Sequence, residues 1–71
     1  MNTKLKILDV VALLKNIPGQ NLAIGQVGTI VETLTGNVFE VEFSGSNGET
    51  IATAPVEGDS LLLLHYEMET A

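Results

Sequence analysis

Short apolar runs separated by turn signals organise this chain. The clearest run is Val38–Phe43, where apolar residues at 39, 41 and 43 alternate with Glu40 and Glu42. Such alternation is typical of a strand with one buried and one wet face. The pattern predicts a strand here, with both glutamates pointing outward.

Four further runs also have strand character, because they are short, rich in β-branched or large apolar residues and bounded by Gly, Pro, Asn or Ser. They cover Lys6–Leu14, Val27–Leu34, Glu49–Ala54 and Leu61–Tyr66. The three residues Thr35–Asn37 and the four residues Gly45–Gly48 predict two compact hairpins. Pro55 is expected to end the fourth strand or to lie on a sheet edge.

The first run is ambiguous. Its apolar residues at positions 7, 10, 11 and 14 also fit a helical stripe. Its β-branched content and the following Pro18-Gly19 favour a strand, followed by a long loop over Lys15–Ile24.

The stretch Gly25–Glu32, Gly-Gln-Val-Gly-Thr-Ile-Val-Glu, reads as a strongly bent strand. Its glycines let the backbone curl or approach a neighbour closely. A phosphate-binding loop would need a following Lys-Ser/Thr and a helix, and neither is predicted.

Five strands joined in this way predict an all-β fold, a small five-stranded SH3-like barrel. One domain is expected over residues 1–71, ordered over residues 4–67, with a frayed tail from Glu67 to Ala71.

Charge is strongly asymmetric. The chain has nine acidic residues against three lysines, a formal net charge of -6, and no Lys or Arg after Lys15. Nucleic acids and anionic membranes are therefore disfavoured as partners, whereas a basic protein is favoured. Solubility alone is the alternative explanation.

No apolar segment approaches the roughly 20 residues that span a bilayer, and the N-terminus lacks a signal-peptide pattern. Cysteine is absent, which excludes disulfides and Cys-based zinc or thiol chemistry. We expect a soluble, cytoplasmic protein without a cofactor or metal.

The sequence shows no arrangement of residues that is typical of a catalytic site. His65 is the one imidazole, at the end of a leucine run, and is expected to be a surface or edge residue. Nothing in the sequence joins a nucleophile, a base and oxyanion donors. We expect no enzyme activity.

Two groups of residues are candidates for an interface. Glu32, Glu40 and Glu42 are expected to form an acidic patch on neighbouring strands, with a merely solvated face as the alternative. In the run Leu61–Leu64, neighbouring leucines point to opposite faces; Leu62 and Leu64 are the candidate interface residues, and the pattern leaves open which pair faces outward. The long first loop could cover that pair instead.

Four segments together carry a family resemblance: Asp9–Leu14, Gly25–Glu32, Phe39–Phe43 and Leu61–His65. They resemble an uncharacterised family of small bacterial domains that is frequent in cyanobacteria. The chain also looks like the SH3-like part of nitrile hydratase small subunits and like KOW motifs. The shared Gly-x-Val-Gly-x-Ile pattern implies the fold and carries little about function.

The sequence therefore predicts a non-catalytic protein–protein interaction module, a small acidic partner or regulator, with an antitoxin-like or immunity-like role as the sharper form. The alternative is an assembly accessory or chaperone-like subunit of a larger enzyme. A homo-oligomer is a further arrangement left open by the exposed leucines.

Overall fold

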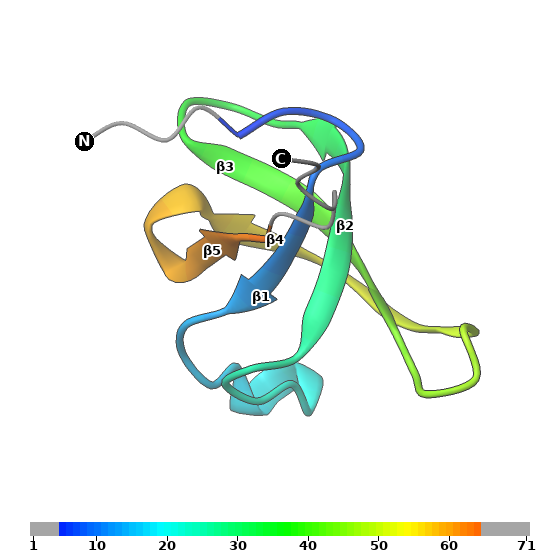
Figure 1. Cartoon of the computed structure of the whole chain (residues 1–71). Helices are drawn as coiled ribbons and strands as arrows, with labels where there is room; N and C mark the ends of the chain where they lie inside the picture. Colours follow the sequence, from blue (N-terminus) through cyan, green and yellow to red (C-terminus); the bar gives the residue numbers. More distant parts are fainter. Residues whose placement is uncertain (1–4, 65–71) are drawn as a thin grey trace, which may run out of the picture.

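The computed structural model describes residues 5–64, and these form a small antiparallel β-structure (Figure 1). The all-β class predicted from the sequence is confirmed. The strands are β1 (Val10–Leu13), β2 (Val27–Thr33), β3 (Val38–Ser44), β4 (Thr50–Glu57) and β5 (Leu61–Leu63); two short 3-10 helices are η1 (Pro18–Gln20) and η2 (Gly58–Ser60).

The five strands form one sheet in the order β4-β3-β2-β1-β5. All four pairings are antiparallel, and β1 lies between β2 and β5. The sheet curves strongly, and η2 carries the chain from one edge strand, β4, to the other, β5 (Figure 1). This arrangement is compatible with the predicted SH3-like fold.

The core lies on the inner face of this curved sheet. Its largest fully buried side chains are Phe43, Leu13, Ile30, Val11 and Val41. The predicted alternation on β3 is confirmed, because residues 39, 41 and 43 are buried while Glu40 and Glu42 are half-buried on the opposite face. Leu22 from the long loop also enters the core.

Gly28 explains why the second strand is rich in glycine. It pairs with Phe43 on β3, and a Cβ at this position would lie 2.8 Å from the Glu42 carbonyl oxygen and 2.9 Å from Phe43 Cδ1. The absence of a side chain therefore lets β2 and β3 pack closely over the core.

The first strand is shorter than predicted. It begins at Val10 rather than Lys6, because Lys6–Asp9 form a tight turn in which the Asp9 N–H donates to the Lys6 carbonyl at 3.0 Å. The Asp9 carboxylate accepts a second bond from the Lys6 backbone N–H at 2.9 Å. The apolar residues at positions 7 and 8 thus belong to a turn, although their pattern suggested a strand.

The ends of β4 and β5 also differ from the prediction by several residues. β4 continues through Pro55 to Glu57, which an edge strand tolerates because the proline nitrogen can face away from β3. β5 ends at Leu63, and Leu64 follows it. His65, Tyr66 and the predicted frayed tail lie outside the described residues.

Candidate functional site

The register of the sheet determines which side chains share its outer face, the face opposite the core. Thr29 on β2 pairs with Glu42, and Glu32 pairs with Glu40. All three glutamates predicted as an acidic patch therefore lie on the outer face of the adjacent strands β2 and β3. We call Glu32, Glu40 and Glu42 the acidic patch.

The acidic patch contains a directly opposed pair of like charges, Glu32 and Glu40. In the part of the chain that the structure describes, the one ion pair is Lys6–Asp9, at 3.2 Å between Nζ and Oδ1, and it does not involve the patch. Glu42 accepts a hydrogen bond from Thr50 Oγ1 at 3.0 Å. Like charges directly opposite each other destabilise a sheet, so the patch works against folding stability.

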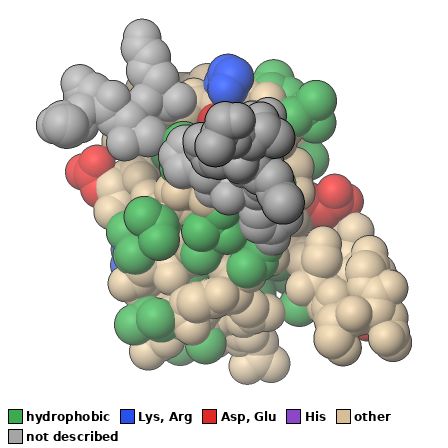
Figure 2. Space-filling model, viewed as in Figure 1, with side chains coloured by type: hydrophobic (Ala, Val, Ile, Leu, Met, Phe, Trp, Pro, Cys, Tyr) green, Lys and Arg blue, Asp and Glu red, His purple; other side chains and the backbone are tan. Residues whose placement is uncertain are grey.

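The other half of the outer face is apolar. Ala12 on β1 pairs with Val27 on one side and with Leu62 on the other, and Leu62 is 50% exposed. Leu64 is half-buried just after β5, where its N–H donates to the Val10 carbonyl at 2.9 Å. Figure 2 shows hydrophobic side chains exposed over β1 and β2.

Four of the five predicted interface residues thus lie on the outer face of the sheet: Glu32, Glu40, Glu42 and Leu62. Val10 pairs with Thr29, and Thr29 pairs with Glu42, so one cross-strand row joins the apolar half to the acidic patch. Whether a partner uses this surface stays a prediction.

Sequence reasoning missed a third feature beside the acidic patch. Ile7, Leu8 and Val31 are 50%, 74% and 39% exposed, and the Leu8 N–H donates to the Ile30 carbonyl at 2.7 Å. We call these three residues the apolar tip. Leu8 looks like an ordinary strand residue in the sequence, and the Lys6–Asp9 spacing was the one available signal for a turn.

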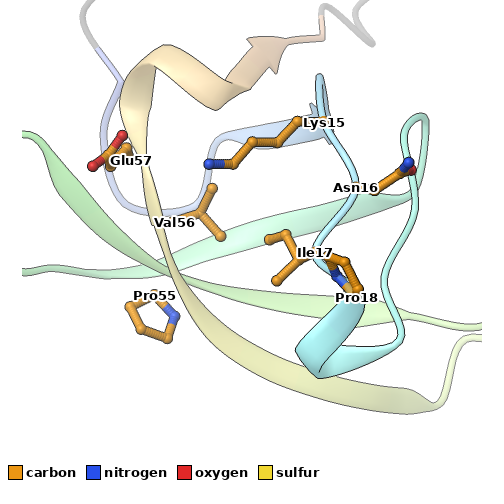
Figure 3. Close-up of a pocket in the computed structure, with 7 residues that line it drawn as sticks. All are labelled: Lys15, Asn16, Ile17, Pro18, Pro55, Val56 and Glu57. Carbon is orange, nitrogen blue, oxygen red and sulfur yellow. The ribbon is translucent and has the colours of Figure 1, made fainter.

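A shallow groove of about 370 Å³ lies between the long loop and β4. Its lining residues are Lys15, Asn16, Ile17, Pro18, Pro55, Val56 and Glu57. Figure 3 shows Lys15 extending across the groove toward β4, with Ile17 and Val56 between the two walls. The volume is at the small end for ligand sites, and the lining offers one cation and one anion with little other polar chemistry.

Possible metal ligands were compared across the described residues 5–64. No group of three or more His, Cys, Asp or Glu side chains within this range is arranged to hold a metal ion. His65, the sequence's imidazole, lies outside it. Among the described residues there is also no helix with the length and apolarity needed to cross a membrane.

Comparison with known protein families assigns the chain to one of them. A family model described as "Domain of unknown function (DUF4926)" matches residues 7–63, which is more than half of the sequence. The chain belongs to this family. The match extends from the turn before β1 to the end of β5, so the DUF4926 domain includes the acidic patch and the apolar tip. The searches of curated proteins and of solved structures each returned no match.

The expected membership of an uncharacterised domain family is therefore confirmed. The family description carries no activity, so any function has to be argued from the surface of the DUF4926 domain itself.

Proposed function

We propose that this chain is a non-catalytic protein–protein interaction module whose outer face binds a basic partner protein. The observation that carries the proposal is the direct cross-strand pairing of Glu32 with Glu40. Two like charges placed opposite each other cost stability, so folding gives no reason for them. Lys or Arg side chains of a partner would relieve this repulsion and would also steer association.

The rest of the charge distribution supports the same partner. The net charge of -6 and the absence of Lys or Arg after Lys15 leave the outer face without cations of its own along β2–β5. A nucleic acid or an anionic membrane would be repelled by this surface, whereas a basic protein would be attracted to it.

The sharper form of the proposal is an antitoxin-like or immunity-like protein that masks a basic target such as a nuclease. Electrostatic complementarity favours this form, since nucleases need a cationic surface to bind their substrate. The second candidate is an assembly accessory of a larger enzyme, and the exposed apolar half around Leu62 favours it, because subunit contacts are commonly apolar. The neighbouring gene separates the two: a basic toxin-like product or an enzyme subunit.

The test removes the negative charge of two side chains while keeping the size and shape of each side chain nearly the same. The double variant Glu32→Gln/Glu40→Gln is compared with Glu49→Gln/Asp59→Asn, which removes the same charge from the β3–β4 hairpin and from η2. We expect the first variant to recover less of the partner from the source cell. Its association with the purified partner should be several-fold slower at low salt, with a weaker salt dependence.

The control variant should bind nearly as the wild type does. The Glu32/Glu40 variant should also unfold at a slightly higher temperature, because the cross-strand repulsion is gone; such a pair is worth about 0.2–1 kcal/mol. Equal recovery and equal association rates for both variants would show that the acidic patch serves solubility only.

A further inference from the structure

The turn before β1 holds a leucine in an unfavourable backbone conformation. Leu8 has a φ of 79° at the third position of the Lys6–Asp9 turn. This position of a type II turn is normally Gly or Asn, because a Cβ is disfavoured at positive φ. A bulky residue there is a genuine outlier and points to a constraint other than folding.

Burial gives little compensation for this conformation. The Leu8 side chain is 74% exposed, so it gains little from burial to offset the backbone cost. Exposed leucines are common by themselves, so the positive φ is the feature that makes Leu8 unusual.

Several hydrogen bonds nevertheless hold the turn in this conformation. Asp9 accepts hydrogen bonds from both the backbone N–H and the Nζ of Lys6, at 2.9 and 3.2 Å. The Leu8 N–H is bonded to the Ile30 carbonyl at 2.7 Å, which attaches the turn to β2. The backbone of the turn is therefore held by hydrogen bonds before binding, which lowers the ordering entropy lost when Leu8 contacts a partner.

A bulge in β2 completes the tip. The register between β2 and β3 shifts between Ile30 and Glu32, which leaves Val31 as the extra residue. Val31 therefore lies between Ile30, whose carbonyl accepts the hydrogen bond from Leu8, and Glu32 of the acidic patch. The turn passes the upper end of β2, and Figure 2 shows hydrophobic side chains beside a lysine at this end of the molecule (Figures 1 and 2).

We propose that the apolar tip is the anchor of the binding surface, and that its occupant is an amphipathic segment of a partner protein with apolar residues flanked by Lys or Arg. This inference rests on the proposed function and names the chemistry of the partner. An apolar projection beside carboxylates that have no ion-pair partner among residues 5–64 matches an interface anchor surrounded by charged contacts.

Charge complementarity selects this occupant. A second copy of the chain would bring another net charge of -6 against the acidic patch. An anionic membrane would meet the same repulsion, although Ile7 and Leu8 alone could enter an interfacial layer. A basic amphipathic segment satisfies both the apolar tip and the adjacent Glu32.

The experiment uses three synthetic peptides of equal length in an NMR titration of the full chain. One alternates leucine and lysine in a helical amphipathic pattern, one replaces its leucines by serine, and one replaces its lysines by glutamate. We expect the leucine–lysine peptide to bind most tightly and to shift the amides of the Lys6–Asp9 turn and of Val31–Glu32 most. The lysine–serine peptide should bind more weakly, and the leucine–glutamate peptide should not bind.

The variant Leu8→Asn introduces a residue that tolerates positive φ and removes the apolar side chain. We expect the Kd for the leucine–lysine peptide to rise at least about tenfold, as for an interface anchor. The matched control is Ile24→Asn, which changes an exposed residue in the connection between β1 and β2, outside the Lys6–Asp9 turn, and should leave the Kd unchanged.

Stability separates a binding role from a structural one. Leu8→Asn and Leu8→Gly should both melt at the wild-type temperature or above it, because they relieve the positive-φ strain. A lower Tm for both variants would show that Leu8 serves the fold and would overturn the proposal. So would an unchanged Kd for Leu8→Asn, shifts confined to the groove, or no binding of the leucine–lysine peptide by the wild type.

Different results would contradict the proposed function and the proposed anchor. If the Glu32/Glu40 variant loses its partner while Leu8→Asn keeps it, the interaction module stands and the anchor is wrong. If neither variant affects capture of the partner, the outer face itself is not the binding surface.

Discussion

At the scale of single residues, the side chain that is missing at Gly28 matters as much as those that are present. The strand pair β2–β3 approaches so closely there that a Cβ would contact a backbone oxygen at 2.8 Å. Backbone cannot move aside as a flexible side chain can, so the contact must be relieved by separating the strands.

We expect Gly28→Ala to destabilise the protein by about 1–3 kcal/mol, the usual range for overpacking. The control is Gly19→Ala, where nothing lies within 4 Å of the added Cβ and φ is not positive. That variant should be neutral or stabilising by about 0.4–1 kcal/mol, because alanine restricts the unfolded chain. Chemical denaturation of both variants checks this, and equal stabilities would contradict the close-approach argument.

Predictions for single residues were correct where apolar and polar side chains alternate along a strand. They failed where hydrogen bonds determine the backbone conformation. The inward residues of β3 and the outward Glu40 and Glu42 followed from period-two patterning. Leu8 could not be found in this way, because its turn depends on the Asp9 carboxylate reaching the Lys6 backbone and on a bond to Ile30. No hydrophobic pattern encodes those contacts.

At the scale of elements, the four consecutive leucines have different roles. Leu61 is 7% exposed and belongs to the core, whereas the neighbouring Leu62 is 50% exposed on the outer face. Strand alternation was visible in the sequence. The end of β5 after Leu63 was not, because the leucine run continues past it.

Alanine substitution should separate these two neighbours. We expect Leu61→Ala to cost about 2–5 kcal/mol, as for other buried leucines. Leu62→Ala should change the stability by less than about 0.5 kcal/mol, since exposed substitutions are nearly neutral. Thermal melts of the monomer test the difference. A comparable loss for both would mean that Leu62 is covered in solution.

At the scale of the whole molecule, the acidic charge decides which partners are excluded. The class of fold was predictable from turn spacing and composition, and so was the acidic side of the sheet. The curvature that places the Lys6–Asp9 turn beside the β2 bulge was not, since it depends on the long-range pairing of β1 with β2.

We expect no measurable binding to DNA or RNA at physiological salt. Non-specific binding in the range of about 10⁻⁴–10⁻⁶ M depends on cationic contacts, and residues 16–71 provide none. An electrophoretic mobility assay at low micromolar protein checks this for single- and double-stranded probes. A retarded band that disappears at higher salt would contradict the assignment of the partner as a protein.

Pro55 has a consequence for how these molecules behave when they are crowded together. β4 is an edge strand, and an unpaired edge can template the growth of fibrils by strand addition. Because the proline nitrogen cannot donate, the row of outward N–H groups is interrupted between Thr53 and Glu57. The opposite edge strand, β5, spans three residues and offers few backbone groups for pairing with an incoming strand. We therefore expect concentrated solutions of this acidic domain to resist edge-to-edge joining of their sheets.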